Sequence, residues 1–372
     1  MSTIAIDAVG IGGTGGGRSA TMNLLREMLQ QDTTNHYVLL LDRPEPELSA
    51  EHVRQVLLPV HQRFLCRAWG QVTWPVSLRH QSVELVHHIK NLSAVALPGR
   101  SIVTIYDMTT VLHPELYSRT DVLYWRHVQP RLLRRADRII AISQQTANDL
   151  IRLYNLPPNL IAVIYPAYDP RFRPLPSSEA ERVRIKYGLG PRYILHVGSI
   201  SRKKNLLTLF LAFERLCKAG YDGKLVLVGR QYTQGHDDAL YAHLERSNQR
   251  ARVLLTGPVP DKDLPALYNA AELSVFPSLH EGFGLVAVEA MACGTPLICS
   301  STGALPEVVG DGGVLLQDAC DPTAIAGAME HLLNDVPART ALIARGLERA
   351  ALYRPAIAAG RTLALYRELL TS

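Results

Sequence analysis

The sequence lacks the features that mark membrane-spanning and disulfide-bonded proteins. No apolar run approaches the roughly 20 residues needed to cross a bilayer, and no basic segment precedes a hydrophobic one near the N-terminus. The five cysteines are odd in number and include no C-x-x-C pair, so neither a disulfide framework nor a zinc site is indicated. We therefore expect a cytoplasmic protein.

The composition is that of a large globular protein. The chain has 372 residues, of which 47% are hydrophobic and 20% charged. This length is about twice that of a typical domain, and the apolar content is sufficient for two cores. The same apolar content rules out general disorder, and the sequence contains no short-period repeat and no low-complexity tract.

The formal net charge of +5 is unevenly distributed. Basic residues crowd one segment just after Tyr124 and Trp125, namely Arg126, His127, Arg131, Arg134, Arg135 and Arg138. Such a segment fits peripheral contact with an anionic membrane surface, at the inner face for a cytoplasmic protein, or a solvated helix face with paired arginines. No nucleic-acid recognition motif accompanies it, so nucleic acid is not an expected partner.

Apolar strand patterns alternate with helical patterns along the chain, which predicts an α/β fold with parallel sheets. The first alternation runs from the strand Thr3–Val9 to the strand Ile161–Ile164, and a second starts at Tyr193–Val197. A proline-rich passage separates them. We expect two Rossmann-like, doubly wound domains, residues 1–178 and 179–354, with a final helix at 355–372 that packs back on the first domain.

The segment His280–Pro296 combines two glutamates, a turn with two glycines and the start of a helix. Gly282 and Gly284 allow the backbone to approach a ligand before the helix begins. The helix N-terminus has unpaired N–H groups and a positive dipole end, so the amides of Phe283, Gly284, Leu285 and Val286 are suited to bind a pyrophosphate without a metal.

The two carboxylates would then serve opposite ends of a sugar joined to a diphosphate. Glu289, about a turn and a half inside the helix, is placed to accept both hydroxyls of a ribose. Glu281, before the helix, would hydrogen-bond a sugar ring or stabilise charge near its anomeric carbon. The alternative is that Glu281 caps the helix and Glu289 is solvated, but the residues beside Glu289 are almost all apolar.

A glycine-rich loop follows the first strand, and Gly10 to Gly15 also fit the G-x-G-x-x-G fingerprint of an NAD-type dinucleotide site. That site requires an acidic residue about 20 positions further on, whereas Asp42 comes later. An oxidoreductase would also leave Glu281 and Glu289 without a role. We retain this class only as an alternative.

Taken in order along the chain, these segments resemble the retaining glycosyltransferases of family 4, which have the GT-B architecture of two facing Rossmann-like domains. The resemblance covers nearly the whole chain. It rests on the glycine loop, Arg134–Ser143, Asp169–Phe172, Val197–Leu206, Val228-Gly229, Thr256-Gly257 and the segment with two glutamates. It implies sugar transfer in a cleft between the domains.

The resemblance also implies roles for single residues. Lys204 would contact the donor phosphates and stabilise the departing nucleoside diphosphate, which gains charge in the transition state. The further donor-binding residues are Ser199, Arg202, Lys203 and Arg230, together with Gly15, Gly16 and Gly17 of the glycine loop. The alternative is that the basic residues are a solvated helix start, although cations are disfavoured at that end of a helix.

One position departs from the family pattern. Many members have a histidine before an aspartate after a strand of the first domain, whereas this chain has Tyr106-Asp107. A tyrosine hydroxyl can donate a hydrogen bond to the donor sugar, but its pKa makes it a poor base at neutral pH. We include Tyr106 and Asp107 with Glu281 and Lys204 among the candidate catalytic residues.

The expected reaction is transfer from a nucleoside-diphosphate sugar to a hydroxyl of a glycan or lipid-linked acceptor, with retention and without cofactor or metal. The resemblance is to bacterial mannosyltransferase-like members that build surface polysaccharides, so GDP-mannose is the first donor to test and UDP-sugars the next. Asp261-Lys262-Asp263 has the D-x-D form of metal-dependent transferases, but helix capping is the preferred interpretation. A catalytically silent subunit that binds nucleotide sugars remains a further alternative.

Overall fold

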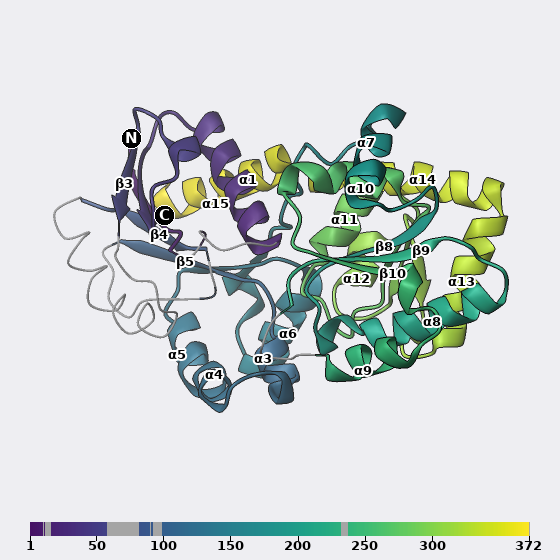
Figure 1. Cartoon of the computed structure of the whole chain (residues 1–372). Helices are drawn as coiled ribbons and strands as arrows, with labels where there is room; N and C mark the ends of the chain where they lie inside the picture. The colour runs from purple at the N-terminus through teal and green to yellow at the C-terminus, as the bar shows by residue number, and fades with distance from the viewer. Residues whose placement is uncertain are drawn as a thin grey trace. The chain divides into compact units, whose positions relative to one another are not determined.

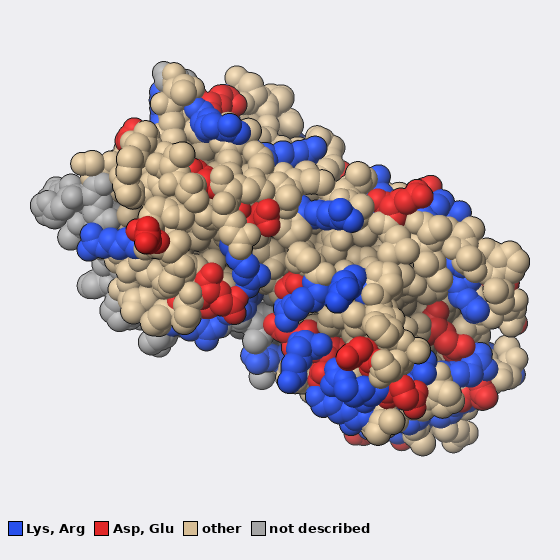
Figure 2. All heavy atoms as spheres, turned by 90° about the horizontal axis from the view of Figure 1, so that it is seen from above, with Lys and Arg blue, Asp and Glu red and all other residues tan. Residues whose placement is uncertain are grey.

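The computed structural model describes residues 1–9, 11, 16–57, 82–89, 91, 99–231 and 237–371, and the remaining residues are drawn in grey in Figures 1 and 2. The chain forms two compact units, Met1–Tyr168 with Arg354–Ser372, and Asp169–Tyr353. The first unit therefore contains both ends of the chain. The change of unit comes at Asp169 rather than at residue 178, because the proline-rich segment packs on the second unit: the Leu175 N–H donates to Asn269 Oδ1 at 2.8 Å.

A parallel sheet forms the centre of the first unit (Figure 1). Its seven described strands are β1 (Thr3–Asp7), β2 (His36–Leu41), β3 (Val53–Leu57), β4 (Leu85–His88), β5 (Arg100–Ile105), β6 (Arg138–Ala141) and β7 (Ile161–Val163). They lie in the order β3-β2-β1-β4-β5-β6-β7. The apolar patterns of the sequence do not predict β3 or β4.

Helices cover the sheet of the first unit on both faces. They are α1 (Gly16–Gln31), α3 (Thr109–Leu112), α4 (Arg119–Leu123), α5 (Gln129–Leu133), α6 (Gln144–Tyr154) and α15 (Pro355–Thr371). Side chains alternate along each strand, so Ile102 of β5 faces α1 and α15, whereas Val103 faces α5 and α6. Helices α1 and α15 come from opposite ends of the chain and lie side by side (Figure 1).

The second unit has a parallel sheet of six described strands. These are β8 (Tyr193–Val197), β9 (Lys224–Val228), β10 (Val253–Gly257), β11 (Leu273–Phe276), β12 (Leu297–Ser300) and β13 (Val314–Leu316). The order is β10-β9-β8-β11-β12-β13, which reverses direction at β8. The helices are α7 (Ser177–Tyr187), α8 (Leu206–Lys218), α9 (Asp238–Arg246), α10 (Leu264–Ala270), α11 (Leu285–Ala292), α12 (Leu305–Val309), α13 (Pro322–Asn334) and α14 (Val336–Ala350).

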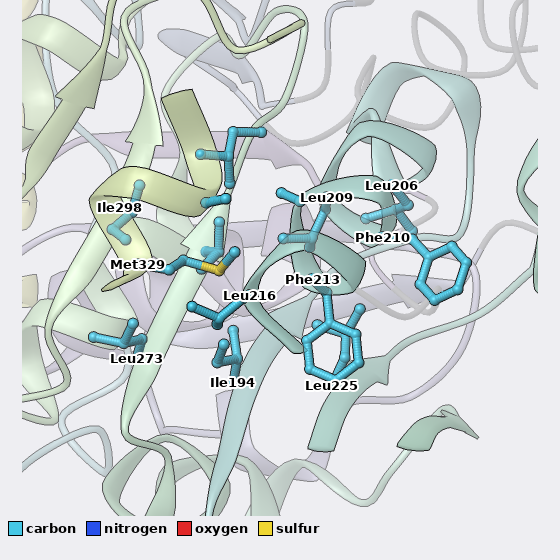
Figure 3. Close-up of a cluster of buried hydrophobic side chains, with 14 of the residues drawn as sticks. Ile194, Leu206, Leu209, Phe210, Phe213, Leu216, Leu225, Leu273, Ile298 and Met329 are labelled. Carbon is cyan, nitrogen blue, oxygen red and sulfur yellow. The ribbon is translucent and has the colours of Figure 1, made fainter. Parts of the chain in front are cut away.

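Helices α8 and α13 close one face of this sheet over a large apolar core. In Figure 3, Phe213 and Leu216 of α8 and Met329 of α13 lie over Ile194 and Leu273 from neighbouring strands. All five side chains are almost fully buried. This core makes the sheet a rigid support, so the loops at its carboxyl edge start from fixed positions.

Candidate active site

The candidate site of the second unit lies where its strand order reverses. In open parallel sheets, ligands bind outside the carboxyl ends of the strands at such a point, because the flanking loops diverge there. Here the point lies between β8 and β11, which are neighbours in the sheet. The loops that follow these two strands are joined, since the Leu279 N–H donates to the carbonyl of Lys203 at 2.9 Å.

Lys204 and Glu281 form an ion pair across this reversal point. Lys204 Nζ donates to Glu281 Oε1 at 2.6 Å, and only 14% and 12% of the two side chains are exposed. Burial disfavours the charged carboxylate, but the charges of Lys204 and Lys203 outweigh it and lower the pKa of Glu281 to about 2. Glu281 is therefore an anion at neutral pH, and it does not act as a helix cap.

The loop after β12 fixes the backbone of Glu281. The Ala304 N–H donates to the carbonyl of Glu281 at 2.9 Å, and Ser300 Oγ donates to the carbonyl of Ser278 at 2.6 Å. A Cβ at Gly303 would lie 2.3 Å from the Glu281 carbonyl oxygen, so this close approach requires glycine. The position of the carboxylate is thus set by the loops after β11 and β12.

Helix α11 presents an unpaired N-terminus beside this pair. The helix starts after Gly284, whose φ is +89° and whose missing Cβ would lie 2.4 Å from Leu305 Cδ2. The N–H groups of Gly284, Leu285 and Val286 donate to no described residue. Together with the helix dipole they form a site suited to an anion. Phe283 is buried and packs edge-on against Tyr353.

Glu289 lies on α11, with 5% of the residue exposed. Burial raises the pKa of its carboxyl to about 8, and the nearby charges of Asp169 and Asp261 act in the same direction, whereas the hydrogen bond from Tyr268 opposes them. The Tyr268 hydroxyl donates to Glu289 Oε2 at 3.3 Å. With its pKa raised in this way, the side chain of Glu289 favours the neutral form near pH 7 when no ligand is bound.

The basic residues of this region differ in their surroundings. Lys204 ends the short 3-10 turn Arg202–Lys204, and α8 starts two residues later. A cation before a helix N-terminus requires a nearby anion, and in this structure Glu281 is that anion. Arg202 and Arg230 are exposed, the latter just after β9. Ser199 lies at hydrogen-bond distance from Ser201, with 3.2 Å between their hydroxyl oxygens.

The candidate residues of the first unit lie at the carboxyl ends of β1 and β5. Thr21 Oγ1 donates to the carbonyl of Gly17 at 2.8 Å, so the Tyr106 hydroxyl, 3.0 Å away, donates to Thr21. Burial raises the pKa of Tyr106. Asp107 Oδ1 accepts the N–H of Thr109 at 3.0 Å. Gly16 and Gly17 begin α1, while Gly15 lies outside the described residues.

Sequence reasoning missed His196, which lies in β8 and is fully buried. Its Nδ1 donates to the carbonyl of Val275 at 3.0 Å, while Nε2 has no partner among the described residues. Burial lowers the pKa of His196 to about 4, so the ring is neutral at physiological pH. A histidine in the centre of an otherwise apolar strand was the available signal.

The Asp261-Lys262-Asp263 segment has a structural role that differs from the predicted one. Asp263 occupies the N-cap position of α10, but its side chain makes no cap hydrogen bond. It is buried and instead accepts the Tyr187 hydroxyl at 2.7 Å and pairs with Lys186. The capping interpretation is therefore wrong. No cluster of metal-ligating side chains occurs in the parts of the chain that the structure describes.

Comparison with known proteins identifies the chain as a glycosyltransferase. The model of glycosyl transferases group 1 matches residues 177–349, and that of glycosyltransferase family 4 matches residues 14–172. The O-antigen chain mannosyltransferase B of Escherichia coli is 34% identical over 269 residues, which are 72% of this chain and 70% of that protein. The chain belongs to this family of glycosyltransferases.

Two of the solved structures that share the fold resemble this chain over almost its whole length. Sucrose-phosphate synthase from Thermosynechococcus elongatus has a TM-score of 0.81 at 23% identity, and each chain is covered completely. HepE from Anabaena in complex with UDP-glucose has a TM-score of 0.79 at 18% identity, with 99% of this chain and 100% of HepE covered. With its two parallel α/β units, the chain has the GT-B fold. The GT-B prediction is confirmed, and an oxidoreductase is excluded by the family.

Proposed function

We propose that the protein transfers a hexose, with mannose as the first candidate, from a nucleoside-diphosphate donor to an acceptor hydroxyl with retention of anomeric configuration. The acceptor is a glycan or a lipid-linked saccharide in the synthesis of a surface polysaccharide. The observation that carries the proposal is the adjacency of the Lys204–Glu281 pair to the unpaired amides at the start of α11.

The geometry supports a diphosphate site without a metal. Three backbone N–H groups and the ammonium of Lys204 supply positive potential at one edge of the sheet, where the leaving group would gain charge. Before the donor binds, Glu281 neutralises Lys204. The donor phosphates would then compete for the ammonium, and the released carboxylate of Glu281 would face the sugar. We accordingly propose that neither a metal nor another cofactor takes part.

Retention fits a route in which the acceptor attacks from the side on which the diphosphate leaves. The leaving phosphate oxygen then takes the acceptor proton, so no enzyme base is required. His196 and Tyr106 are suited to positioning rather than to proton abstraction, because the first is fully buried and the pKa of the second is raised. The protein would contribute orientation and charge stabilisation.

The choice of donor rests on a relative. The name of the Escherichia coli protein specifies mannose transfer to the O-antigen chain, and its identity of 34% extends over most of both chains. GDP-mannose is therefore the first donor to test. HepE was solved with UDP-glucose, so UDP-sugars form the comparison set.

Release of the nucleoside diphosphate from each donor tests the proposal. The purified chain should hydrolyse one nucleotide sugar slowly without an acceptor and faster with one, and EDTA should leave the rate unchanged. Proton NMR of the freshly released sugar should show the anomer of the donor. Donor binding without turnover would support the silent subunit instead, and loss of activity in EDTA would refute metal independence.

Two variants separate the roles of the glutamates. Glu289→Ala should mainly weaken donor binding and raise KM, whereas Glu281→Ala should mainly lower kcat. Glu330→Ala, at an exposed position of α13, is the matched control. Unchanged KM and kcat in both variants would show that neither glutamate takes part in donor binding or turnover.

A further inference from the structure

The fully buried ring of His196 has one nitrogen, Nε2, without a partner among the described residues. We infer that Nε2 positions Lys204: it accepts a hydrogen bond from the Lys204 ammonium while the diphosphate of the donor is bound. The inference rests on the proposed function, because it concerns how Lys204 is held against the donor phosphates. It adds a residue of β8 to a site otherwise built from loops and the start of α11.

The tautomer of His196 follows from the hydrogen bond that its other nitrogen makes. Nδ1 lies 3.0 Å from the carbonyl oxygen of Val275, and a carbonyl oxygen only accepts, so Nδ1 carries the proton. Because burial lowers the pKa of His196 to about 4, the ring is neutral and Nε2 presents a lone pair. A buried acceptor without a hydrogen bond is unfavourable, so the group that satisfies Nε2 must be a donor.

Gly198 leaves open the space that Nε2 shares with Lys204. A Cβ at residue 198 would stand 3.1 Å from His196 Nε2 and 3.5 Å from Lys204 Cε, so both atoms border the same small space. The ammonium nitrogen Nζ is bonded directly to Cε. Rotation about the side-chain bonds of Lys204 therefore brings an N–H donor toward Nε2 while the backbone stays in place.

Phe276 of the neighbouring strand β11 holds both side chains. The rings of His196 and Phe276 stack with their centroids 5.5 Å apart and their planes inclined by 19°. Lys204 Nζ lies 4.6 Å from the centroid of the same phenylalanine ring, whose face attracts a cation. The stacking fixes the plane of the imidazole, and the lysine changes its hydrogen-bond partner without leaving the aromatic face.

The two acceptors of Lys204 differ in charge, and only the carboxylate neutralises the ammonium. The ammonium has three N–H donors, one of which goes to Glu281 Oε1 at 2.6 Å. A neutral imidazole orients the ammonium and leaves its charge intact. When the donor phosphates compete with Glu281, His196 holds Lys204 with its full charge directed at the leaving diphosphate. That charge stabilises the negative charge that develops there.

Two substitutions separate the nitrogens of His196. Asparagine keeps an N–H near the place of Nδ1 for the Val275 carbonyl but has no acceptor at Nε2, whereas glutamine has an amide oxygen near Nε2 but no donor for Val275. Calorimetry of the full chain with GDP and with UDP should show about tenfold weaker binding for His196→Asn than for the parent. His196→Gln should stay within about threefold of the parent. A structural role through Val275 predicts the reverse order.

Nitrogen NMR of the labelled histidine rings observes the hydrogen bond itself. The Nε2 resonance of His196, identified by its absence from the spectrum of His196→Gln, should move upfield when GDP or UDP binds, because the lone pair becomes an acceptor. At saturating nucleotide this movement should be absent in Lys204→Met, which has no N–H. This measurement on the parent also decides the matter if His196→Asn does not fold.

The control substitution is His331→Asn, at an exposed position of α13. It should bind the nucleotide as tightly as the parent and leave the His196 resonances in place. Circular dichroism and urea unfolding establish that each variant is folded before its affinity is compared with that of the parent.

Two results would overturn the assignment. The first is nucleotide binding by His196→Asn as tight as that by His196→Gln or tighter, and the second is an Nε2 resonance that nucleotide binding leaves unchanged. If the parent binds a nucleotide and hydrolyses a donor, either result removes only the role of His196. If the parent binds neither GDP nor UDP, the proposed function and the role of His196 are both wrong.

Discussion

Replacement of Glu289 by glutamine should remove a pH dependence of folding stability that the native residue creates. The pKa of Glu289 rises from its usual 4.5 to about 8 in the native state. Between these values the native chain holds a proton that the unfolded chain has released, so stability falls as the pH rises. Each unit of pKa shift corresponds to about 1.4 kcal/mol. Relative to acidic pH, the free energy of unfolding should therefore be lower by about 3 kcal/mol at pH 7 and by at most about 5 kcal/mol above pH 8.

The glutamine variant stays neutral at every pH and keeps an acceptor for the Tyr268 hydroxyl. Urea unfolding followed by circular dichroism should show that the parent loses about 4 kcal/mol relative to Glu289→Gln between about pH 5 and about pH 8.5. Glu330→Gln, at an exposed position of α13, should follow the parent. Parallel stability curves for the parent and Glu289→Gln would refute the neutral state of Glu289.

The same protonation has a consequence for donor binding. A ribose diol donates hydrogen bonds, so it favours the charged carboxylate and should lower the pKa of Glu289. Binding near pH 7 should then release up to one proton. Calorimetry with a nucleoside diphosphate in buffers of different ionisation enthalpy measures this number, and it should fall to near zero in Glu289→Gln. Equal proton release by the variant would exclude Glu289 as the source.

Three further substitutions test the remaining parts of the site. Glu281→Gln should lower the free energy of unfolding by about 3 kcal/mol at neutral pH. Because the folded pKa is depressed from 4.5 to about 2, this difference should vanish as the pH falls through that range, and parallel urea curves would contradict the ion pair. Gly284→Ala should lower the free energy of unfolding by about 2–5 kcal/mol, because the position has a positive φ and the added Cβ would clash with Leu305. Gly188→Ala is the control: its φ is also positive but a Cβ meets no atom within 4 Å, so the loss should be about 1–2 kcal/mol. Tyr106→Phe removes the hydrogen bond to Thr21 and should cost about 1 kcal/mol in urea unfolding, and an unchanged kcat would exclude a role for the hydroxyl in catalysis.

Much of the fold follows from periodicity in the sequence. Strand β8 of the second unit and the helix that follows Gly284 lie where the pattern predicts them, because their environment is set by neighbours in the same α/β repeat. Strand β4 was missed because only the first two residues of Leu-Val-His-His are apolar and the two histidines interrupt the apolar run. His87 is nevertheless fully buried, since Thr104 and Tyr366 satisfy its two ring nitrogens at 2.7 and 2.6 Å.

The chemistry of the site depends on contacts between distant positions and was predicted only in part. The residue types and their order identify Lys204 and Glu281 as candidates, but their ion pair joins positions far apart in the sequence. The raised pKa of Glu289 could not be predicted because it depends on burial by the folded chain and on the charges of Asp169 and Asp261, which come from other segments. The functional roles of all these residues stay predictions until donors are tested.

The return of the last helix to the first unit constrains how the protein can be dissected. Residues 169–353 form one uninterrupted unit, whereas no single stretch of chain encodes the other. A fragment ending at Tyr168 would lack α15, so the apolar surface of α1 would meet water and His87 would lose its contact with Tyr366. On the ribosome, the second unit is therefore synthesised in full before the first can close its core, and the order of completion is opposite to the order of the sequence.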